Sequence, residues 1–489
     1  MTFIPILKIV VPLFILLVLI LKSRKSSIYL VSLPILLALG GNIYLFKYNM
    51  QFEILGISLG IHDFLLTLQV IAWIYVLFTR PDRMIIRRNP GYRLAIGILI
   101  YYLLIIIISL PDLEKIIGRQ IFYFPRMYLL PVGFLIMLDT YRRFSIEEVM
   151  TFLIDLRNIV LIICILYIIN ALYPGATYEI NEGDVYDPIT GIFRSYTFPS
   201  ILFFLALAIT IGENKYLFKE IVITAIMLTA VVFTYGRNLI LTSTAVIILG
   251  RFLNSGKGSA NRKKFIQLAI GFIAIVATLI IMQEVFFPQY SFLLKRMETL
   301  VLGASDSSYL GRLDLLENAV MAAKQNSILL GAGAYANNSD TWVMGSWDSD
   351  LYQLIIRSGL IGVGLFLLVH VSTLWGSIRL MNRRTEKSFE ITIISMLFIF
   401  AMSLFSLTST NYMQYPTIAT IGFVFISIEA GKLWSPAVQT RGLPMLNFMP
   451  AGMSLKHILS HRAYSILGLI LVALLAYLFA VTILFRFFS

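Results

Sequence analysis

Long apolar runs recur along the whole chain and define its predicted elements. Two of them, Val11–Leu21 and Leu94–Leu110, contain no charged residue. A helix of about 20 residues crosses the hydrocarbon core of a bilayer, so runs of this kind predict membrane-spanning helices. The pattern predicts an all-α polytopic membrane protein with about fourteen such helices, near residues 3–21, 28–46, 61–79, 94–110, 121–139, 151–170, 197–212, 220–235, 238–253, 265–283, 350–376, 390–409, 417–431 and 464–486.

Composition supports the same class. The chain has 489 residues, of which 58% are hydrophobic and 13% charged, and its mean hydropathy is +0.85. A soluble domain carries about 25% charged residues, so the membrane region forms the body of the protein. Residues 1–20 are apolar but lack a basic start and a small-residue cleavage site, and we therefore expect them to form a helix rather than a cleaved signal peptide.

The distribution of lysine and arginine predicts which helix ends face the cytoplasm. Of 39 such residues, 25 lie in alternate connections, and 13 lie in the other connections, at adjoining helix ends and at the termini, with Arg157 inside a helix. Cytoplasmic loops retain positive charge, so the richer set is predicted inside and both termini outside. The net charge of +13 is then a topology signal reinforced by anionic cytoplasmic lipid, and no nucleic-acid partner is expected.

Two outward loops are long. The predicted helices divide the chain into residues 1–283 with outward loop 171–196, a large outward loop 284–349, and residues 350–489. Within the large loop, Ser308 is a candidate cap for a helix that runs to about Lys324, because Leu313, Leu316, Val320 and Ala323 fall on one face. Gly331–Tyr335 then ends this helix. A 66-residue loop with its own helix is more often functional than disordered.

Four outward arginines are candidate ligands for an anion. They are Arg194, Arg237, Arg312 and Arg357, the last about two turns inside the membrane. Positive charge on the outer side opposes the topology rule, so each should have a partner. A guanidinium binds phosphate through two parallel hydrogen bonds and keeps its charge, which suits a lipid-linked pyrophosphate. The alternative is that each pairs with a nearby carboxylate, as Arg312 would with Asp314 or Glu317.

Two carboxylates stand at the mouth of the eleventh predicted helix, in Trp347-Asp-Ser-Asp-Leu351. Asp348 or Asp350 could accept a proton from an attacking sugar hydroxyl. Asp348 or Ser349 could equally cap the helix, and the two roles are compatible. Trp347, Tyr196 and Tyr235 are candidates for stacking on sugar rings, although an interfacial aromatic belt is equally expected.

The sequence gives no reason to expect a metal or another cofactor. The single cysteine, Cys164, lies inside an apolar run and excludes a disulfide within one chain. None of the four histidines pairs with it, and His457 and His461 belong to a basic linker with no third ligand nearby.

Three short motifs, taken in order, resemble the O-antigen ligase and polymerase superfamily of bacterial envelopes. They are Arg312-Leu-Asp-Leu-Leu-Glu-Asn-Ala319, Leu330-Gly-Ala-Gly333, and the stretch from Trp347 to Gly362 that ends Gly359-Leu-Ile-Gly362. Arg194 and Arg237 match the arginines that contact the lipid pyrophosphate in that family. Ligases carry a histidine where this chain has Asp348, and this departure favours the polymerase branch.

The resemblance implies a metal-independent, inverting glycosyltransferase in the bacterial cytoplasmic membrane. It would transfer a growing glycan from one polyprenyl pyrophosphate to the terminal sugar of another lipid-linked repeat unit, with membrane lipid and a chain-length-regulating membrane protein as further partners. Two alternatives remain open at this point. One is ligation of the glycan to a lipid A core. The other is a flippase for lipid-linked oligosaccharide, which would need polar residues along a path through the membrane.

Overall fold

Membrane helices account for most of the described chain. The computed structural model describes residues 21–22, 26–32, 35, 52–54, 57–59, 61–79, 89–110, 130–172, 185–187, 192–194, 200–213, 217–234, 237–255, 307–333, 349–381, 386–406 and 419–433. Within these residues the helices are α2 (Ile28–Val31), α4 (Ile61–Thr79), α5 (Pro90–Ile108), α7 (Leu130–Tyr141), α8 (Ile146–Leu172), α9 (Ser200–Glu213), α10 (Leu217–Phe233), α11 (Arg237–Ser255), α14 (Ser307–Asn326), α15 (Asp350–Met381), α16 (Glu386–Ser406) and α18 (Ile421–Leu433).

Four of the described helices contain segments long and apolar enough to cross a membrane, namely Gly91–Ile108, Ile146–Ile169, Asp350–Ile378 and Lys387–Ser406. Shorter apolar helices, among them α7, α9 and α18, accompany them. The chain is therefore a membrane protein with several spanning helices. The helices predicted at 3–21, 265–283 and 464–486, and most of the one at 28–46, lie outside the described residues.

Two short hairpins depart from the all-α prediction. Strand β1 (Phe52–Ile54) pairs antiparallel with β2 (Ile57–Leu59), and β3 (Val185–Asp187) pairs with β4 (Ile192–Arg194). In the second hairpin Tyr186 lies opposite Phe193. Both hairpins lie in predicted connections between helices, so they alter the loops and leave the helical bundle as expected.

Local signals explain where several helices begin. The Asn89 side chain accepts hydrogen bonds from the N–H groups of Gly91 and Tyr92, and Pro90 follows as the first residue of α5. Before α8, Ser145 and Glu148 form a reciprocal capping box, with each side chain accepting from the other residue's N–H. These caps satisfy N–H groups that have no partner within the helix.

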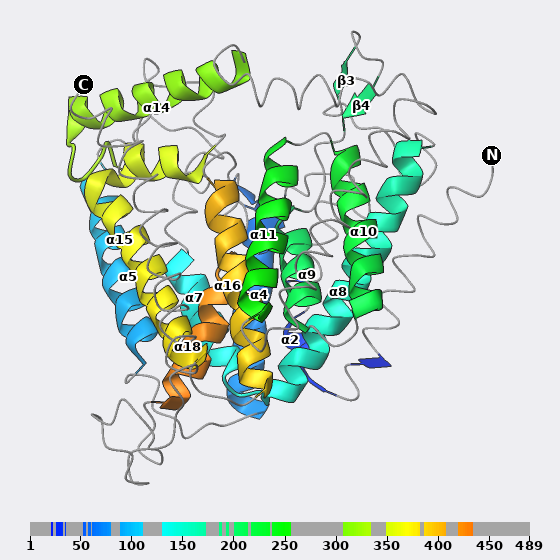
Figure 1. The fold of residues 1–489 in the computed structure, drawn as a ribbon. Coiled ribbons are helices and arrows are strands. Elements are labelled where there is room, and N and C mark those ends of the chain that lie inside the picture. Colours follow the sequence, from blue (N-terminus) through cyan, green and yellow to red (C-terminus); the bar gives the residue numbers. More distant parts are fainter. Residues whose placement is uncertain are drawn as a thin grey trace, which may run out of the picture.

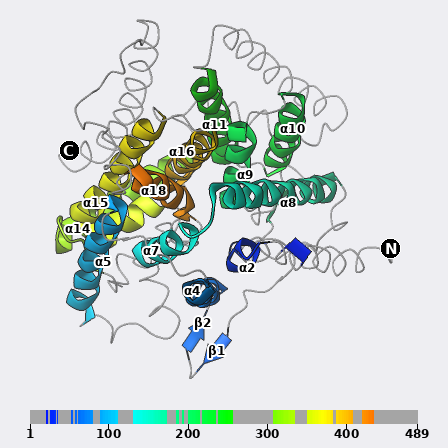
Figure 2. The ribbon, with the colours of Figure 1, turned by 90° about the horizontal axis from the view of Figure 1, so that it is seen from below.

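Helix α16 forms the centre of the bundle. It packs against α8, α9, α11, α15 and α18, and its residues from Glu390 to Ile399 are buried. Seen from below, α16 and α18 lie between α5 and α15 on one side and α8 to α11 on the other (Figure 2). By contrast α5 exposes Ile100, Leu104 and Ile107, as expected for a helix that faces lipid.

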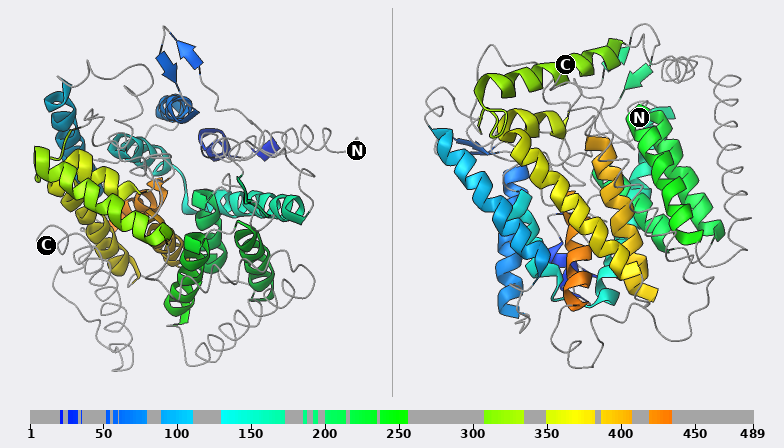
Figure 3. Two further views of the ribbon diagram at one scale, coloured as in Figure 1. Left: turned by 90° about the horizontal axis from the view of Figure 1, so that it is seen from above. Right: turned by 60° about the vertical axis from the view of Figure 1, so that its left-hand side comes forward.

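Helix α14 lies across one end of the bundle, which we call the loop end (Figure 1). Hairpin β3–β4 lies at the same end, as the predicted topology requires of two loops on one side of a membrane. The expected helix from Ser308 to Lys324 is confirmed as Ser307–Asn326. Val320 and Ala323 of its predicted apolar face are buried against α5 and α15. Figure 3 shows α14 stacked over the first turns of α15.

Thiol labelling tests which end faces out. Gln325, near the end of α14, is exposed, and Lys387, at the opposite end of the bundle, has a side chain that is 51% exposed. We expect Gln325→Cys to react with a membrane-impermeant thiol reagent in intact cells, and Lys387→Cys to react only after permeabilisation. The native Cys164 is 0% exposed and serves as the silent background. The reverse labelling pattern would overturn the side assignment.

Candidate functional site

Helix α15 is bent at Gly359, close to the loop end. Gly359 has φ 56° and ψ −160°, a backbone region that is essentially restricted to glycine. A Cβ at this position would lie 2.5 Å from both the Gly331 nitrogen and the Leu329 oxygen. The segment of α15 before the bend runs along α14, and the segment after it descends through the bundle (Figures 1 and 3). The predicted helix at 350–376 is thus present, with a change of direction inside it.

The bend interrupts the ladder of hydrogen bonds within the helix, and the turn after α14 supplies replacements. Ala332 N–H donates to Ile356 O at 2.6 Å, Leu360 N–H donates to Ile328 O at 3.0 Å, and Ile361 N–H donates to Leu329 O at 3.1 Å. In addition, the Tyr101 hydroxyl on α5 donates to Ser358 O at 2.7 Å. Unbonded backbone groups cost several kcal/mol each in a membrane interior. The bend is stable because another segment bonds to it.

Two glycines let the turn approach this closely. Gly331 has φ 72° and Gly333 has φ 93°, both in the left-handed region that favours glycine. A Cβ at Gly331 would meet the Ile356 oxygen at 2.6 Å, and one at Gly333 would meet the Cβ of Ser109 at 2.8 Å. The sequence predicted that Gly331–Tyr335 ends the loop helix. The structure adds that residues 327–333 join α14 to α15 and to the end of α5.

A buried polar face lies on the segment of α15 before the bend. Asp350, Gln353 and Arg357 share one face at spacings of three and four residues, and they are 2%, 2% and 5% exposed. Arg357 Nε donates to Gln353 Oε1 at 2.9 Å, so the arginine is oriented by its own helix. This face combines a cation, an amide and a carboxylate at the loop end of a membrane bundle.

Ser349 caps this segment. Its hydroxyl accepts a hydrogen bond from Leu351 N–H at 3.2 Å and donates to the Ser406 carbonyl of α16 at 3.1 Å. Ser349, one of the two candidates for the cap, makes such a bond, and it also connects α15 to the central helix α16.

The other predicted site residues are placed only in part. Arg194 ends β4 and Arg237 begins α11, while Arg312 stands in the second turn of α14. Figure 1 shows these elements reaching the loop end. Their side chains lie outside the described part of the chain, as do the whole of Asp348, Trp347, Tyr196 and Tyr235. The convergence of the four arginines and the roles of these residues therefore stay predictions.

Two residues of the site were not predicted. Gln353 stands four residues before Arg357, a spacing that places the two on neighbouring turns of one helix, so an amide and a guanidinium in an apolar run already carried the signal. Tyr101 had no such signal, because its bond to Ser358 joins residues 257 apart in the sequence.

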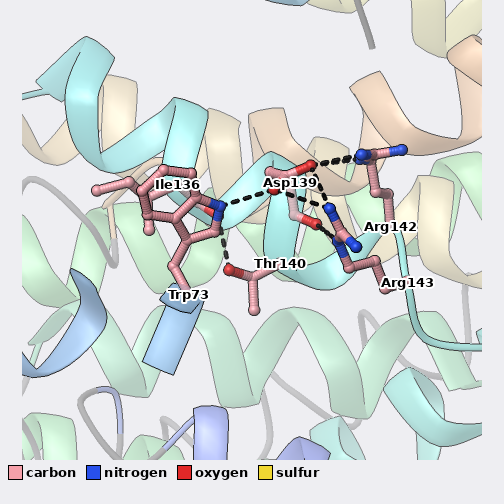
Figure 4. Close-up of polar contacts among 6 residues, drawn as sticks. All are labelled: Trp73, Ile136, Asp139, Thr140, Arg142 and Arg143. Carbon is pink, nitrogen blue, oxygen red and sulfur yellow. Dashed lines mark hydrogen bonds and ion pairs between the residues drawn. The ribbon is translucent and has the colours of Figure 1, made fainter. Parts of the chain in front are cut away.

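Charged residues at the opposite end are tied into ion pairs. The Asp139 carboxylate accepts hydrogen bonds from Trp73 Nε1 at 2.7 Å and from Arg142 Nε at 2.8 Å. Arg143 Nη2 forms an ion pair with Asp139 Oδ2 at 3.2 Å (Figure 4). Further pairs join Arg157 to Glu213, Arg251 to Glu220 and Lys22 to Asp155. These contacts link α8 to Lys22 and to α9, and α10 to α11, so the charges of α8 have a structural role.

No protein-family model matches the chain, and a comparison with curated proteins finds no match. Among the described residues, no group of three or more histidine, cysteine, aspartate or glutamate side chains is arranged to hold a metal ion. The site must therefore be interpreted from its own geometry.

The bend makes a direct prediction. We expect Gly359→Ala to lower the thermal stability of the purified protein, because a non-glycine residue in this backbone region costs about 1–3 kcal/mol and its Cβ would meet Gly331 and Leu329. Gly364→Ala is the matched control on the same helix, where a Cβ would meet nothing within 4 Å. Equal melting temperatures of the two variants would show that the bend tolerates a side chain.

Proposed function

We propose that the chain is a membrane glycosyltransferase that polymerises polyprenyl-pyrophosphate-linked oligosaccharide repeat units on the outer face of the bacterial cytoplasmic membrane. The observation that carries this proposal is the buried polar face Asp350–Gln353–Arg357, on a segment whose apolar residues pack against α14. A buried arginine in a membrane protein is a functional-site candidate by default. Here Gln353 orients its guanidinium, which favours bidentate binding of an anion such as a pyrophosphate.

The proposed reaction needs an activated hydroxyl and a stabilised leaving group. The acceptor sugar hydroxyl attacks the anomeric carbon of the donor, the new glycosidic bond forms, and the bond from that carbon to the pyrophosphate oxygen breaks with inversion. A carboxylate, Asp348 or Asp350, takes the hydroxyl proton. Arginines stabilise the negative charge that develops on the departing pyrophosphate, so the scheme requires no metal. The partners are two lipid-linked glycans, with a chain-length-regulating membrane protein as a third.

The charges inside the bundle favour an enzyme over a flippase. A flippase would need polar groups along a path through the membrane. Asp155 and Arg157, two residues that could form such a path, instead bond to Lys22 and Glu213. Ligation of the glycan to a lipid core uses the same leaving group, and the acceptor alone distinguishes it from polymerisation.

The arginines give the first test of this proposal. We expect Arg194→Ala, Arg237→Ala and Arg312→Ala each to lose most glycan elongation, measured as a ladder from purified protein and lipid-linked repeat units. Arg→Lys should recover little, because an ammonium does not reproduce the two-pronged contact. Lys324→Ala is the control for Arg312, since both residues lie on α14. Normal ladders from all three alanine variants would show that these arginines do not bind the pyrophosphate.

The carboxylates give the second test. Asp348→Asn keeps the size of the side chain and its capping ability but removes the proton acceptor. If Asp348 is the base, the rate of elongation should fall by about 10²–10⁴, and if it acts only as a cap, the rate should persist. Asp350→Asn is measured in parallel at matched protein levels and matched melting temperature, because Asp350 is buried. Full activity in both variants would exclude both carboxylates as the base.

A further inference from the structure

A cavity of about 290 Å³ lies between α5, α7, α15 and α18, away from the site at the loop end. Its walls are mostly apolar and include Leu94, Phe134, Phe366 and Phe423. The start of α5 and the end of α18 line it, through Gly91 and Ala430. Because the other end of α5 meets Gly333 at the loop end, the cavity belongs to the opposite half of the bundle.

The cavity borders on the lipid-facing surface. Trp375 lines it and is 52% exposed, and on the same stretch of α15 Leu368 and Val371 are 49% and 43% exposed. The cavity is lined from within the spanning segments Gly91–Ile108 and Asp350–Ile378. At this depth the surroundings of the protein are hydrocarbon chains, so a chain of a bilayer lipid is the apolar group that can enter.

The main polar group at the rim is already bonded within the protein. The Asn89 side chain accepts from Gly91 N–H at 2.8 Å and donates to the Ser427 carbonyl at 2.8 Å. His370, in the wall, donates from Nδ1 to the Phe366 carbonyl at 2.8 Å and lies against the rings of Phe366 and Phe423. The walls therefore suit a hydrocarbon chain rather than a polar ligand.

Positive charge gathers where this cavity reaches the end of the bundle. At these ends of α5, α7, α15 and α18 the sequence places five basic residues against two acidic ones, namely Arg93, Arg142, Arg143, Arg379 and Lys432 against Asp139 and Glu429. Asp139 forms ion pairs with both Arg142 and Arg143 (Figure 4). Basic sites between membrane helices on the cytoplasmic side bind anionic lipid headgroups.

We propose that this cavity and its basic rim form a binding site for an anionic phospholipid of the inner leaflet. One acyl chain occupies the cavity, and the phosphate lies at the basic rim near Arg93. The proposal shares with the proposed function only the assignment of the loop end to the outside. It does not depend on the transfer reaction, because the cavity lies at the other end of the bundle from Asp350 and Arg357.

The test uses purified full-length protein stripped of lipid in a non-ionic detergent. We expect phosphatidylglycerol to raise the melting temperature more than phosphatidylcholine with the same acyl chains, because a ligand that binds only the folded state stabilises it. Gly376→Phe should abolish that difference by filling the cavity, since a Cβ there meets only Ile426 at 3.4 Å. Gly364→Phe, on the exposed side of the same helix, should keep it.

A second variant tests the contribution of the positive charge at the rim to lipid binding. Arg93→Gln should reduce the preference for phosphatidylglycerol while leaving the smaller effect of phosphatidylcholine, and it decides the question if Gly376→Phe does not fold. Equal shifts with both lipids, or equal loss in Gly376→Phe and Gly364→Phe, would overturn the proposal. A shift produced by polyprenyl phosphate but not by phosphatidylglycerol would also overturn it and would identify a substrate tail as the occupant. Glycan elongation is measured separately, so failure of one proposal leaves the other standing.

Discussion

A sharp bend in a membrane helix releases backbone N–H and C=O groups, and these groups must find new hydrogen-bond partners. At Gly359 the donors and acceptors come from residues 328–332 and from Tyr101. These hydrogen bonds together fix the path of α15, the position of α14 across the end of the bundle, and the orientation of the segment that carries Asp350, Gln353 and Arg357. The candidate site depends on them, because they hold the segment that carries the polar face.

Buried arginines are held differently at the two ends of the bundle. At the loop end Arg357 is buried and bonded to an amide of its own helix. At the opposite end the buried charges are paired between helices, as Arg157 is with Glu213 and Arg251 with Glu220. Both arrangements give a buried guanidinium polar partners inside the protein, and they differ in whether the partner belongs to the same helix or to another.

Hydropathy predicted the described helices well, because lipid imposes both helix formation and length on an apolar run. The helix at 61–79 has the predicted bounds, and α14 was found from its periodicity, although Ser308, the predicted cap, lies inside the helix as its second residue. The bend was not predicted, since glycine is common in membrane helices and its conformation here is imposed by a segment about thirty residues earlier. The hairpins were missed because three-residue strands leave no measurable alternation. Whether the arginines predicted in three separate loops converge depends on how these loops are placed in the folded protein, and no local sequence pattern encodes that placement.

The connection between α14 and α15 also constrains how the protein is made. Residues 327–333 leave the ribosome before the bend at Gly359, yet Gly331 and Gly333 adopt conformations that are matched to α15 and to the end of α5. The hydrogen bonds between this turn and α15 can therefore form only after α15 has been synthesised. A chain that stops short of α15 lacks both these bonds and the polar face Asp350–Gln353–Arg357.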